Sequence, residues 1–393
     1  MEIYGRVKKI IKDIMNTTIF FWMPLFIVLY VYLAYPALLW VWGRRLKPPA
    51  YRLSSFSTIS IIISAYNEER YIKRKIENAL SIDYPKEAMQ VIVVSDGSSD
   101  RTLEIANSFS DERLKVIEVR ERKGKPNALN QGLPHATGDI LVFTDANVFF
   151  ERSSIQALVK PFSDASCGAV SGCVELMALE DGEPLGEGAY MKYERFMQLY
   201  ESLLHTMVGI DGGMFAIRRK HVTELPTNII LDDFYMAMRA IDNDARIVYQ
   251  PTAKAHEMVP ASVSQEFRRK TRIAAGGFQV LKYMEFLKQP VKYSKAAFFF
   301  VSHKLLRWLS PFFLLSLLGF SIYSDGSLVI DVFFWLQFVF YGLAIIGLLI
   351  PALRNRMIVY IPYYFSAMNI ACFVGFWRHL FGIQKVTWSR VER

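Results

Sequence analysis

The sequence predicts an α/β domain with a doubly wound, mostly parallel sheet, flanked along the chain by membrane-spanning helices. Three observations lead to this prediction. Hydrophobic residues make up 52% of the 393 residues and charged residues 21%, which is too apolar for an ordinary soluble protein. Several stretches long enough to cross a bilayer contain no charge. Between them, short β-branched runs alternate with amphipathic helical segments, which is typical of parallel sheets.

The charge balance and the cysteines narrow the class of protein. Lys and Arg number 46 against 37 Asp and Glu, a formal charge of +9. Such an excess suits nucleic acid, anionic lipid or a phosphorylated substrate. In a membrane protein it reflects first the basic residues beside anionic headgroups, so we expect a lipid bilayer and no nucleic acid as partner. Cys167, Cys173 and Cys372 show neither a CxxC spacing nor a nearby His cluster, so we expect free thiols.

The N-terminal part contains the first predicted span. Residues 1–18 form a basic segment, and an uncharged stretch from Ile19 to Trp42 predicts a transmembrane helix over residues 19–43. Basic residues follow directly, which favours a cytosolic position for the next domain, although the basic residues before the span nearly balance them. The following basic residues are Arg44, Arg45 and Lys47.

Residues 291–393 predict an interfacial helix and about three spans. The segment that begins near Ala296 carries interspersed lysines, which suits a helix lying in the interface. The basic link at Arg354 predicts a cytosolic loop, and the acidic loop that contains Asp325 predicts an outside one. The basic tail would then lie outside, against the charge rule, unless the last segment is re-entrant. The predicted spans are Leu309–Ser324, Val332–Leu353 and Met357–Trp377.

Residues 58–290 predict the α/β domain, on the cytosolic side of the membrane. Four short apolar runs predict strands and three amphipathic segments predict the helices between them. Ligands of such sheets bind beyond the carboxyl ends of the strands. The predicted strands are Ile59–Ser64, Gln90–Ser95, Leu114–Val119 and Asp139–Thr144, and the helices are Glu69–Ser81, Asp100–Phe109 and Pro126–Ala136.

Each predicted strand is followed by a polar cluster. Any one cluster has an ordinary explanation, such as a turn in which Asp100 caps the next helix. Four clusters at one sheet edge indicate instead a pocket for a nucleoside diphosphate. Asp96 would accept hydrogen bonds from a base or ribose, Lys123 and Lys125 would neutralise the diphosphate, and Asp145 would hold Mg²⁺ or Mn²⁺. The clusters are Ala65-Tyr66-Asn67-Glu68-Glu69, Asp96-Gly-Ser-Ser-Asp100, Arg120-Glu-Arg-Lys-Gly-Lys125 and Asp145-Ala-Asn147.

In their order, these clusters and a later Asp232-Asp233 pair resemble the motifs of the family 2 glycosyltransferases. The membrane-embedded branch with cellulose, hyaluronan, chitin-oligosaccharide and poly-N-acetylglucosamine synthases is most similar. The resemblance implies a GT-A domain at the plasma membrane that binds a nucleotide-diphosphate sugar, usually a UDP-sugar. It places the donor on Ala65, Tyr66, Asn67, Glu68 and Asp96. It also implies that Asp145 and Asn147 stand at the metal-binding Asp-x-Asp motif, where Asn147 offers a neutral carbonyl oxygen.

The resemblance makes Asp233 the general base and Asp232 its acidic neighbour. A carboxylate that deprotonates an acceptor hydroxyl during direct displacement would invert the anomeric configuration. Two acids at a helix start also simply complement its dipole. The resemblance further implies that Asp211, Gly212 and Gly213 form a loop near the acceptor, although a plain turn fits them equally well.

A basic helical segment contains the last motif. In the processive synthases it reads Gln-x-x-Arg-Trp, and here Arg269 stands where Trp is expected. Gln265, Arg268 and Arg272 recur on one helix face, where they would bind the diphosphate or lie as a basic helix at the membrane surface.

Three interpretations follow from the sequence. The first is an inverting transferase that extends a polysaccharide or surface glycan. The second is a single transfer to a polyprenyl-phosphate or other lipid-linked acceptor, which the replacement of Trp by Arg269 favours. The third is a non-catalytic scaffold that kept the fold. The sequence disfavours it, because such a scaffold would be expected to lose the carboxylates that this chain retains.

Overall fold

The computed structural model describes residues 19–52, 55–178, 188–259, 263–322 and 327–386. The basic segment 1–18 and residues 387–393 of the basic tail therefore lie outside the described residues. The described chain divides into two compact units. Of the described residues, the helical unit comprises 19–38, 263–278, 300–322 and 327–384, and the sheet unit comprises 39–52, 55–178, 188–259, 279–299 and 385–386.

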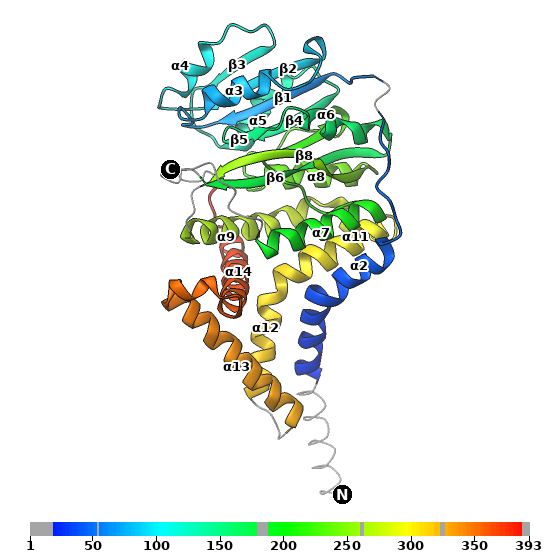
Figure 1. The fold of residues 1–393 in the computed structure, drawn as a ribbon, viewed down its shortest axis with the longest axis vertical. Helices are drawn as coiled ribbons and strands as arrows, with labels where there is room; N and C mark the ends of the chain where they lie inside the picture. Colours follow the sequence, from blue (N-terminus) through cyan, green and yellow to red (C-terminus); the bar gives the residue numbers. More distant parts are fainter. Residues whose placement is uncertain (1–18, 53–54, 179–187, 260–262, 323–326, 387–393) are drawn as a thin grey trace, which may run out of the picture. The chain divides into compact units, whose positions relative to one another are not determined.

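The sheet unit contains an eight-stranded mixed sheet in the order β3-β2-β1-β4-β7-β6-β8-β5. The first four strands in this order run parallel, and they are the four that the sequence predicts. β7 is antiparallel to both β4 and β6, while β6 and β8 run parallel, side by side in Figure 1. The strands are β1 (Ile59–Ala65), β2 (Met89–Asp96), β3 (Leu114–Val119), β4 (Ile140–Asp145), β5 (Val148–Phe150), β6 (Cys167–Ala178), β7 (Met214–Arg218) and β8 (Arg246–Val259).

The strand β1 shows why these runs become central strands. Ile61, Ile62 and Ile63 are fully buried although successive side chains point to opposite faces. A strand covered on both faces needs a continuous apolar run, and β-branched residues suit the pleated backbone. Helices therefore cover both faces of this part of the sheet.

The helices of the sheet unit include the three that the sequence predicts; two are shorter at both ends, and the third begins one residue earlier and ends four residues earlier than predicted. Helix ends fray into turns and 3₁₀ segments, so such shortening is ordinary. The helices are α3 (Ile72–Leu80), α4 (Thr102–Asn107), α5 (Lys125–Gly132), α6 (Ser154–Val159), α7 (Ala189–Leu204), α8 (Asp232–Asp242) and α10 (Glu285–Lys288). Short 3₁₀ segments are η2 (Lys86–Ala88), η3 (Leu133–His135), η4 (Lys160–Ser163), η5 (Arg219–His221) and η6 (Leu281–Tyr283).

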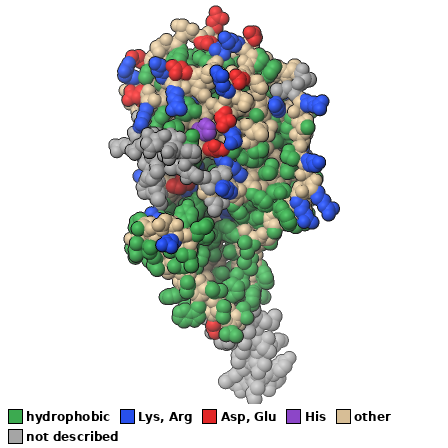
Figure 2. Space-filling view, in the orientation of Figure 1, with side chains coloured by type: hydrophobic (Ala, Val, Ile, Leu, Met, Phe, Trp, Pro, Cys, Tyr) green, Lys and Arg blue, Asp and Glu red, His purple; other side chains and the backbone are tan. Residues whose placement is uncertain are grey.

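Four helices of the described residues are long and apolar enough to cross a membrane. They are Ile19–Gly43, Ser294–Ile322, Leu328–Leu349 and Met357–Leu380. The predicted interfacial stretch and the span after it form one helical run, which continues through Pro311. Figure 2 shows mostly hydrophobic side chains over these helices and many charged ones over the sheet unit. Within the runs lie η1 (Tyr30–Ala34), α2 (Tyr35–Gly43), α11 (Ser294–Phe300), η7 (Val301–Leu305), α12 (Leu306–Ile322), α13 (Leu328–Leu349) and α14 (Met357–Leu380), with η8 (Pro351–Asn355) between the last two.

Helix α9 (Val263–Val280) carries the basic motif and lies largely in the helical unit. A Cβ at Gly277 would lie 2.8 Å from the ring of Trp308 on α12. A Cβ at Gly375 on α14 would lie 2.6 Å from the Ala274 Cβ. These glycines let α9 pack closely against α12 and α14. The basic motif therefore lies on a helix that packs against candidate membrane helices.

Candidate active site

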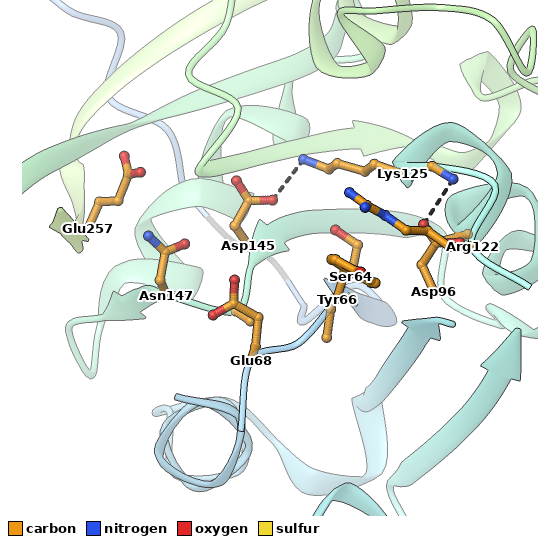
Figure 3. A pocket seen from close by; sticks show the side chains of 13 residues that line it. Ser64, Tyr66, Glu68, Asp96, Arg122, Lys125, Asp145, Asn147 and Glu257 are labelled. Carbon is orange, nitrogen blue, oxygen red and sulfur yellow. Dashed lines mark hydrogen bonds and ion pairs between the residues drawn. The ribbon is translucent and has the colours of Figure 1, made fainter. Parts of the chain in front are cut away.

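A pocket lies at the carboxyl ends of β1, β2 and β4 (Figure 3), where a doubly wound sheet binds ligands. All four predicted polar clusters contribute to it. Arg122 and Glu257 also line it, although the sequence motifs do not single them out. The lining residues are Ser64, Ala65, Tyr66, Glu68, Asp96, Arg122, Gly124, Lys125, Ala128, Asp145, Ala146, Asn147 and Glu257.

Asp96 fixes the segment that leads into α5. Its carboxylate is buried, and it accepts hydrogen bonds from the backbone N–H of Lys123 at 3.1 Å and of Gly124 at 2.9 Å. Gly124 has a φ of 98°, a conformation that glycine adopts without strain. Asp96 therefore shapes the loop on which the basic residues stand, and its direct contact with a base or ribose stays a prediction.

Asn67 joins the loops after β1 and β2 and does not line the pocket. It has a φ of 54°, and its Oδ1 accepts the N–H of Ser99 at 2.8 Å. Asp100 accepts the N–H of Thr102 at 3.0 Å and that of Glu69 at 3.2 Å. Asp100 thus has the capping role of an ordinary turn, and Asn67 contributes to the pocket by shaping its wall.

Tyr66 and Arg122 form a planar stack in the pocket wall. The guanidinium carbon of Arg122 lies 3.7 Å from the centroid of the Tyr66 ring. Arginine stacks in this way on aromatic faces, and the pair offers a flat surface with one positive charge. Lys123, in contrast, does not line the pocket, and its Nζ lies 3.5 Å from Glu121. Arg122 rather than Lys123 is the basic side chain that faces the pocket with Lys125.

Lys125 links the pocket to the start of α8. Its Nζ lies 2.7 Å from Asp145 Oδ1 (Figure 3) and 3.4 Å from Asp232 Oδ2. Burial by itself would lower the pKa of Lys125, but the carboxylates of Asp145, Asp232 and Asp233 outweigh it and raise the pKa. The ammonium therefore stays protonated at any physiological pH and bridges the two acidic motifs.

The Asp232-Asp233 pair opens α8 beside the predicted acceptor loop. Asp232 is buried, and its Oδ2 has the ion pair with Lys125 but no hydrogen bond. Asp233 is half-buried, and its Oδ2 lies so close to Gly212 that a Cβ there would overlap it. Asp211 stabilises that loop by accepting the N–H of Gly213 at 3.2 Å. The structure therefore brings the candidate base and the glycine loop together.

The residues at the Asp-x-Asp position fit a divalent cation that the substrate helps to bind. Asn147 is buried, and its Nδ2 donates to the carbonyl of Met258 at 3.0 Å, while Asp145 and Glu257 line the same pocket. Among the described residues, no group of three His, Cys, Asp or Glu side chains is placed to hold a metal alone. Mg²⁺ sites often combine one or two carboxylates with substrate phosphates, so the oxygen donors here suit Mg²⁺ or Mn²⁺.

The basic motif on α9 lies in the helical unit. Arg268 and Arg269 are exposed and Arg272 is half-buried. Glu266 lies 3.9 Å from Arg269 Nε and 3.4 Å from Lys270 Nζ. The side chain of Gln265 lies outside the described residues. Contact of this motif with a diphosphate stays a prediction.

The chain is similar to curated proteins of known name. Poly-beta-1,6-N-acetyl-D-glucosamine synthase from Staphylococcus aureus (strain COL) is 26% identical over 243 residues, which are 60% of this chain and 58% of that protein. The synthase of that name from Staphylococcus epidermidis (strain ATCC 35984) is 26% identical over 231 residues, 57% of this chain and 55% of that protein. The matches thus span less than two thirds of these relatives.

A solved structure and two family models identify the fold and the family. The mannosyltransferase PcManGT from Pyrobaculum calidifontis, in complex with GDP-Man and Mn²⁺, matches with a TM-score of 0.68. The match has 21% identity and covers 93% of this chain and 100% of that one, which establishes the GT-A fold. The model "Glycosyl transferase family 2" matches residues 60–225, and "Glycosyl transferase family group 2" matches residues 186–378. Together they span most of the sequence, and the chain belongs to the family 2 glycosyltransferases.

Proposed function

We propose that this protein is an inverting glycosyltransferase that extends a polysaccharide or surface glycan at the cytosolic face of the plasma membrane. One observation supports the proposal most strongly. Lys125 lies between Asp145 in the donor pocket and Asp232 at the start of α8. A single cation therefore connects the predicted diphosphate site with Asp232, the residue directly before the predicted base Asp233.

The donor in this proposal is a nucleotide-diphosphate sugar, and the resemblance to the membrane-embedded family 2 synthases favours a UDP-sugar. The Tyr66–Arg122 stack offers its flat surface to the nucleobase of the donor. The Asp96 carboxylate stabilises the loop that carries Arg122. Lys125 and Arg122 supply positive charge to the diphosphate. Lys123, being exposed, would reach the donor only if its side chain turned inward.

Asp145 and the Asn147 carbonyl would hold Mg²⁺ or Mn²⁺ in this proposal. When bound, the metal acts as a Lewis acid that stabilises the charge of the leaving diphosphate. The similar mannosyltransferase binds Mn²⁺ together with its GDP-Man donor, which supports a divalent cation here.

Asp233 accepts the proton of the acceptor hydroxyl. The hydroxyl oxygen forms its bond to the anomeric carbon, while the bond from that carbon to the diphosphate oxygen breaks and its electron pair leaves with the nucleoside diphosphate. The close contact of Asp233 with Gly212 supports this role, because the absence of a side chain at Gly212 leaves room for the carboxylate beside the predicted acceptor loop. Asp232 is less suited, since Lys125 holds its carboxylate. Attack opposite the leaving group inverts the configuration.

A lipid-linked acceptor is the alternative to a growing glycan. Arg269 stands where the processive synthases have a Trp, so the aromatic surface for a sugar is missing there. Either kind of acceptor suits a protein with four candidate spans. The two acceptors differ in the product that they give.

The test uses the detergent-solubilised full chain with Mn²⁺ and a panel of nucleotide-sugars. We expect nucleoside diphosphate release with one donor, release that falls sharply when a chelator removes the metal, and a product with inverted anomeric configuration. A ladder of long products would indicate a polysaccharide, and a single sugar on an added polyprenyl phosphate would indicate the alternative. If no donor releases its nucleoside diphosphate with any acceptor, the proposal fails.

A further inference from the structure

Lys75 is a fully buried lysine to which the proposed reaction assigns no role. It stands on α3, is 0% exposed and does not line the donor pocket. Its Nζ donates to Thr144 Oγ1 at 3.0 Å and to the carbonyl oxygen of Val148. It also lies 3.7 Å from the centroid of the Phe150 ring. All three contacts go to residues on β4 and β5, so the lysine belongs to this corner of the sheet.

The two hydrogen-bond acceptors stand on either side of the Asp145–Asn147 turn. Thr144 directly precedes Asp145 at the end of β4, and Val148 directly follows Asn147 at the start of β5. The ammonium group of Lys75 therefore forms a hydrogen bond at each end of the turn. Three N–H bonds of a lysine can satisfy three such partners, including the face of an aromatic ring.

Neighbouring contacts hold the same segment. Asn78, one turn further along α3, accepts the N–H of Phe150 at 2.8 Å and donates to its carbonyl at 2.9 Å. On the other side, the backbone N–H of Met258 on β8 donates to the backbone carbonyl of Asn147 at 3.1 Å. The backbone carbonyl of Met258 accepts a hydrogen bond from the Asn147 side-chain Nδ2. The turn is thus held between α3 and β8.

A lysine is an unfavourable choice for a place that only needs filling. Burial lowers the pKa of Lys75 well below its ordinary value, against the opposing effect of the Asp145 charge. The adjacent core positions of α3 are filled by Ile72 and Ile76, both fully buried. An apolar residue would fill position 75 without the cost of desolvating an ammonium group. The specific hydrogen bonds to the turn are what the lysine adds.

We infer that Lys75 is a positioning residue of the donor site, which fixes the Asp145–Asn147 turn so that its side chains face the pocket. The inference rests on the proposed function, in which this turn meets the metal and the diphosphate. Lys75 itself touches neither. Replacing a residue that orients a metal ligand without touching the metal commonly changes the metal affinity by about 10-fold to 100-fold.

The experiment compares Lys75→Met with Ile76→Ala in the full chain. Met keeps most of the lysine volume but cannot donate, whereas Ile76→Ala weakens the same helix core without removing a hydrogen bond from the turn. Hydrogen–deuterium exchange is measured over residues 144–150 and over the core strand β2, and Mn²⁺ and nucleoside diphosphate binding are titrated.

For Lys75→Met we expect faster exchange confined to residues 144–150 and half-saturating Mn²⁺ raised by about tenfold. For Ile76→Ala we expect broader exchange changes and unchanged Mn²⁺ binding. Thr144→Val removes one acceptor at equal volume and should change exchange and Mn²⁺ binding in the same direction as Lys75→Met, by less. It also tests the inference if Lys75→Met does not fold.

Unchanged exchange and Mn²⁺ binding in Lys75→Met or in Thr144→Val, or an equal change in Ile76→Ala, would overturn the inference. A wild-type chain that binds no nucleoside diphosphate and releases none would instead defeat the proposed function. The exchange measurement would still show whether Lys75 holds the turn, so the two failures can be told apart.

Discussion

At the scale of single residues, the structure shows contacts of the predicted positions that the motifs do not reveal. The motifs place Asp96 at the nucleotide, whereas both of its oxygens accept backbone N–H groups of the loop before α5. Arg122 replaces Lys123 as the basic side chain in the pocket wall. A sequence shows which side chains follow a strand, but the direction in which a loop turns them depends on backbone geometry such as the positive φ of Gly124.

The contact between Gly212 and Asp233 leads to a prediction. Gly212→Ala would push the Asp233 carboxylate aside, because the new Cβ overlaps its Oδ2. We expect kcat to fall by about 100-fold, since a catalytic group displaced by about 1 Å costs that much, while the donor KM changes little. Steady-state kinetics with the donor that the nucleotide-sugar panel identifies measures both values.

Gly213→Ala is the matched control for that variant. Its Cβ would meet only the methyl groups of Val148 and Val174, at 3.3 Å, and these side chains can shift slightly. A Gly212→Ala enzyme as active as Gly213→Ala would show that Asp233 needs no fixed position.

At the scale of elements, the sequence predicts the first half of the sheet well and the second half poorly. β1 to β4 are short apolar runs whose partners are near in the chain, so periodicity reveals them. β5 has three residues, and it pairs with β8 more than a hundred residues later. β7 is antiparallel between β4 and β6, which no βαβ pattern indicates. Glu257 on β8 enters the pocket through this long-range pairing, so the sequence alone could not place it there.

An ion pair at the start of β3 leads to a prediction about acid stability. The Arg113 guanidinium, 2.7 Å from Asp111, lowers the pKa of Asp111 from 3.8 to about 2. A lowered pKa contributes stability above the unfolded pKa of about 4, and this stability is lost as the pH falls toward 2. Asp111→Asn should cost about 1 kcal/mol at pH 7, a value reduced for partial exposure.

Thermal unfolding of the detergent-solubilised chain measures this effect. The difference in Tm between wild type and Asp111→Asn should be constant from pH 5 to 7 and shrink below pH 4. Glu104→Gln, which breaks the exposed pair with Arg101, should change the Tm little at any of these pH values. Equal effects of the two variants would contradict the account of the Asp111 pair.

At the scale of the whole molecule, composition alone indicates a membrane protein, and four candidate spans support it. The family follows from motif order, because no single short motif is specific. The basic motif of α9 shows the limit of sequence reasoning, since position along the chain suggests the α/β domain whereas packing places most of α9 with the membrane helices.

The proposed orientation in the membrane leads to a prediction about accessibility. If the α/β domain is cytosolic, the link between α12 and α13 is outside and that between α13 and α14 is inside. An impermeant maleimide should label Ser327→Cys in intact cells, and Asn355→Cys only after permeabilisation. Both positions are exposed, and Cys167 and Cys173 are buried; replacing the half-buried Cys372 by Ser in both variants keeps background labelling low. The reverse labelling pattern would place the catalytic domain outside.

The proposed reaction depends on the Asp233 carboxylate as the general base of sugar transfer from a bound nucleotide-sugar. Donor turnover is therefore measured at saturating donor and Mn²⁺ for the wild-type chain, Asp233→Asn and the exposed control Asp83→Asn. General base catalysis contributes about 10²-fold to 10⁴-fold, so we expect a loss of that size in Asp233→Asn with nucleoside diphosphate binding retained, and full activity in Asp83→Asn. Undiminished transfer by Asp233→Asn would show that another group takes the proton.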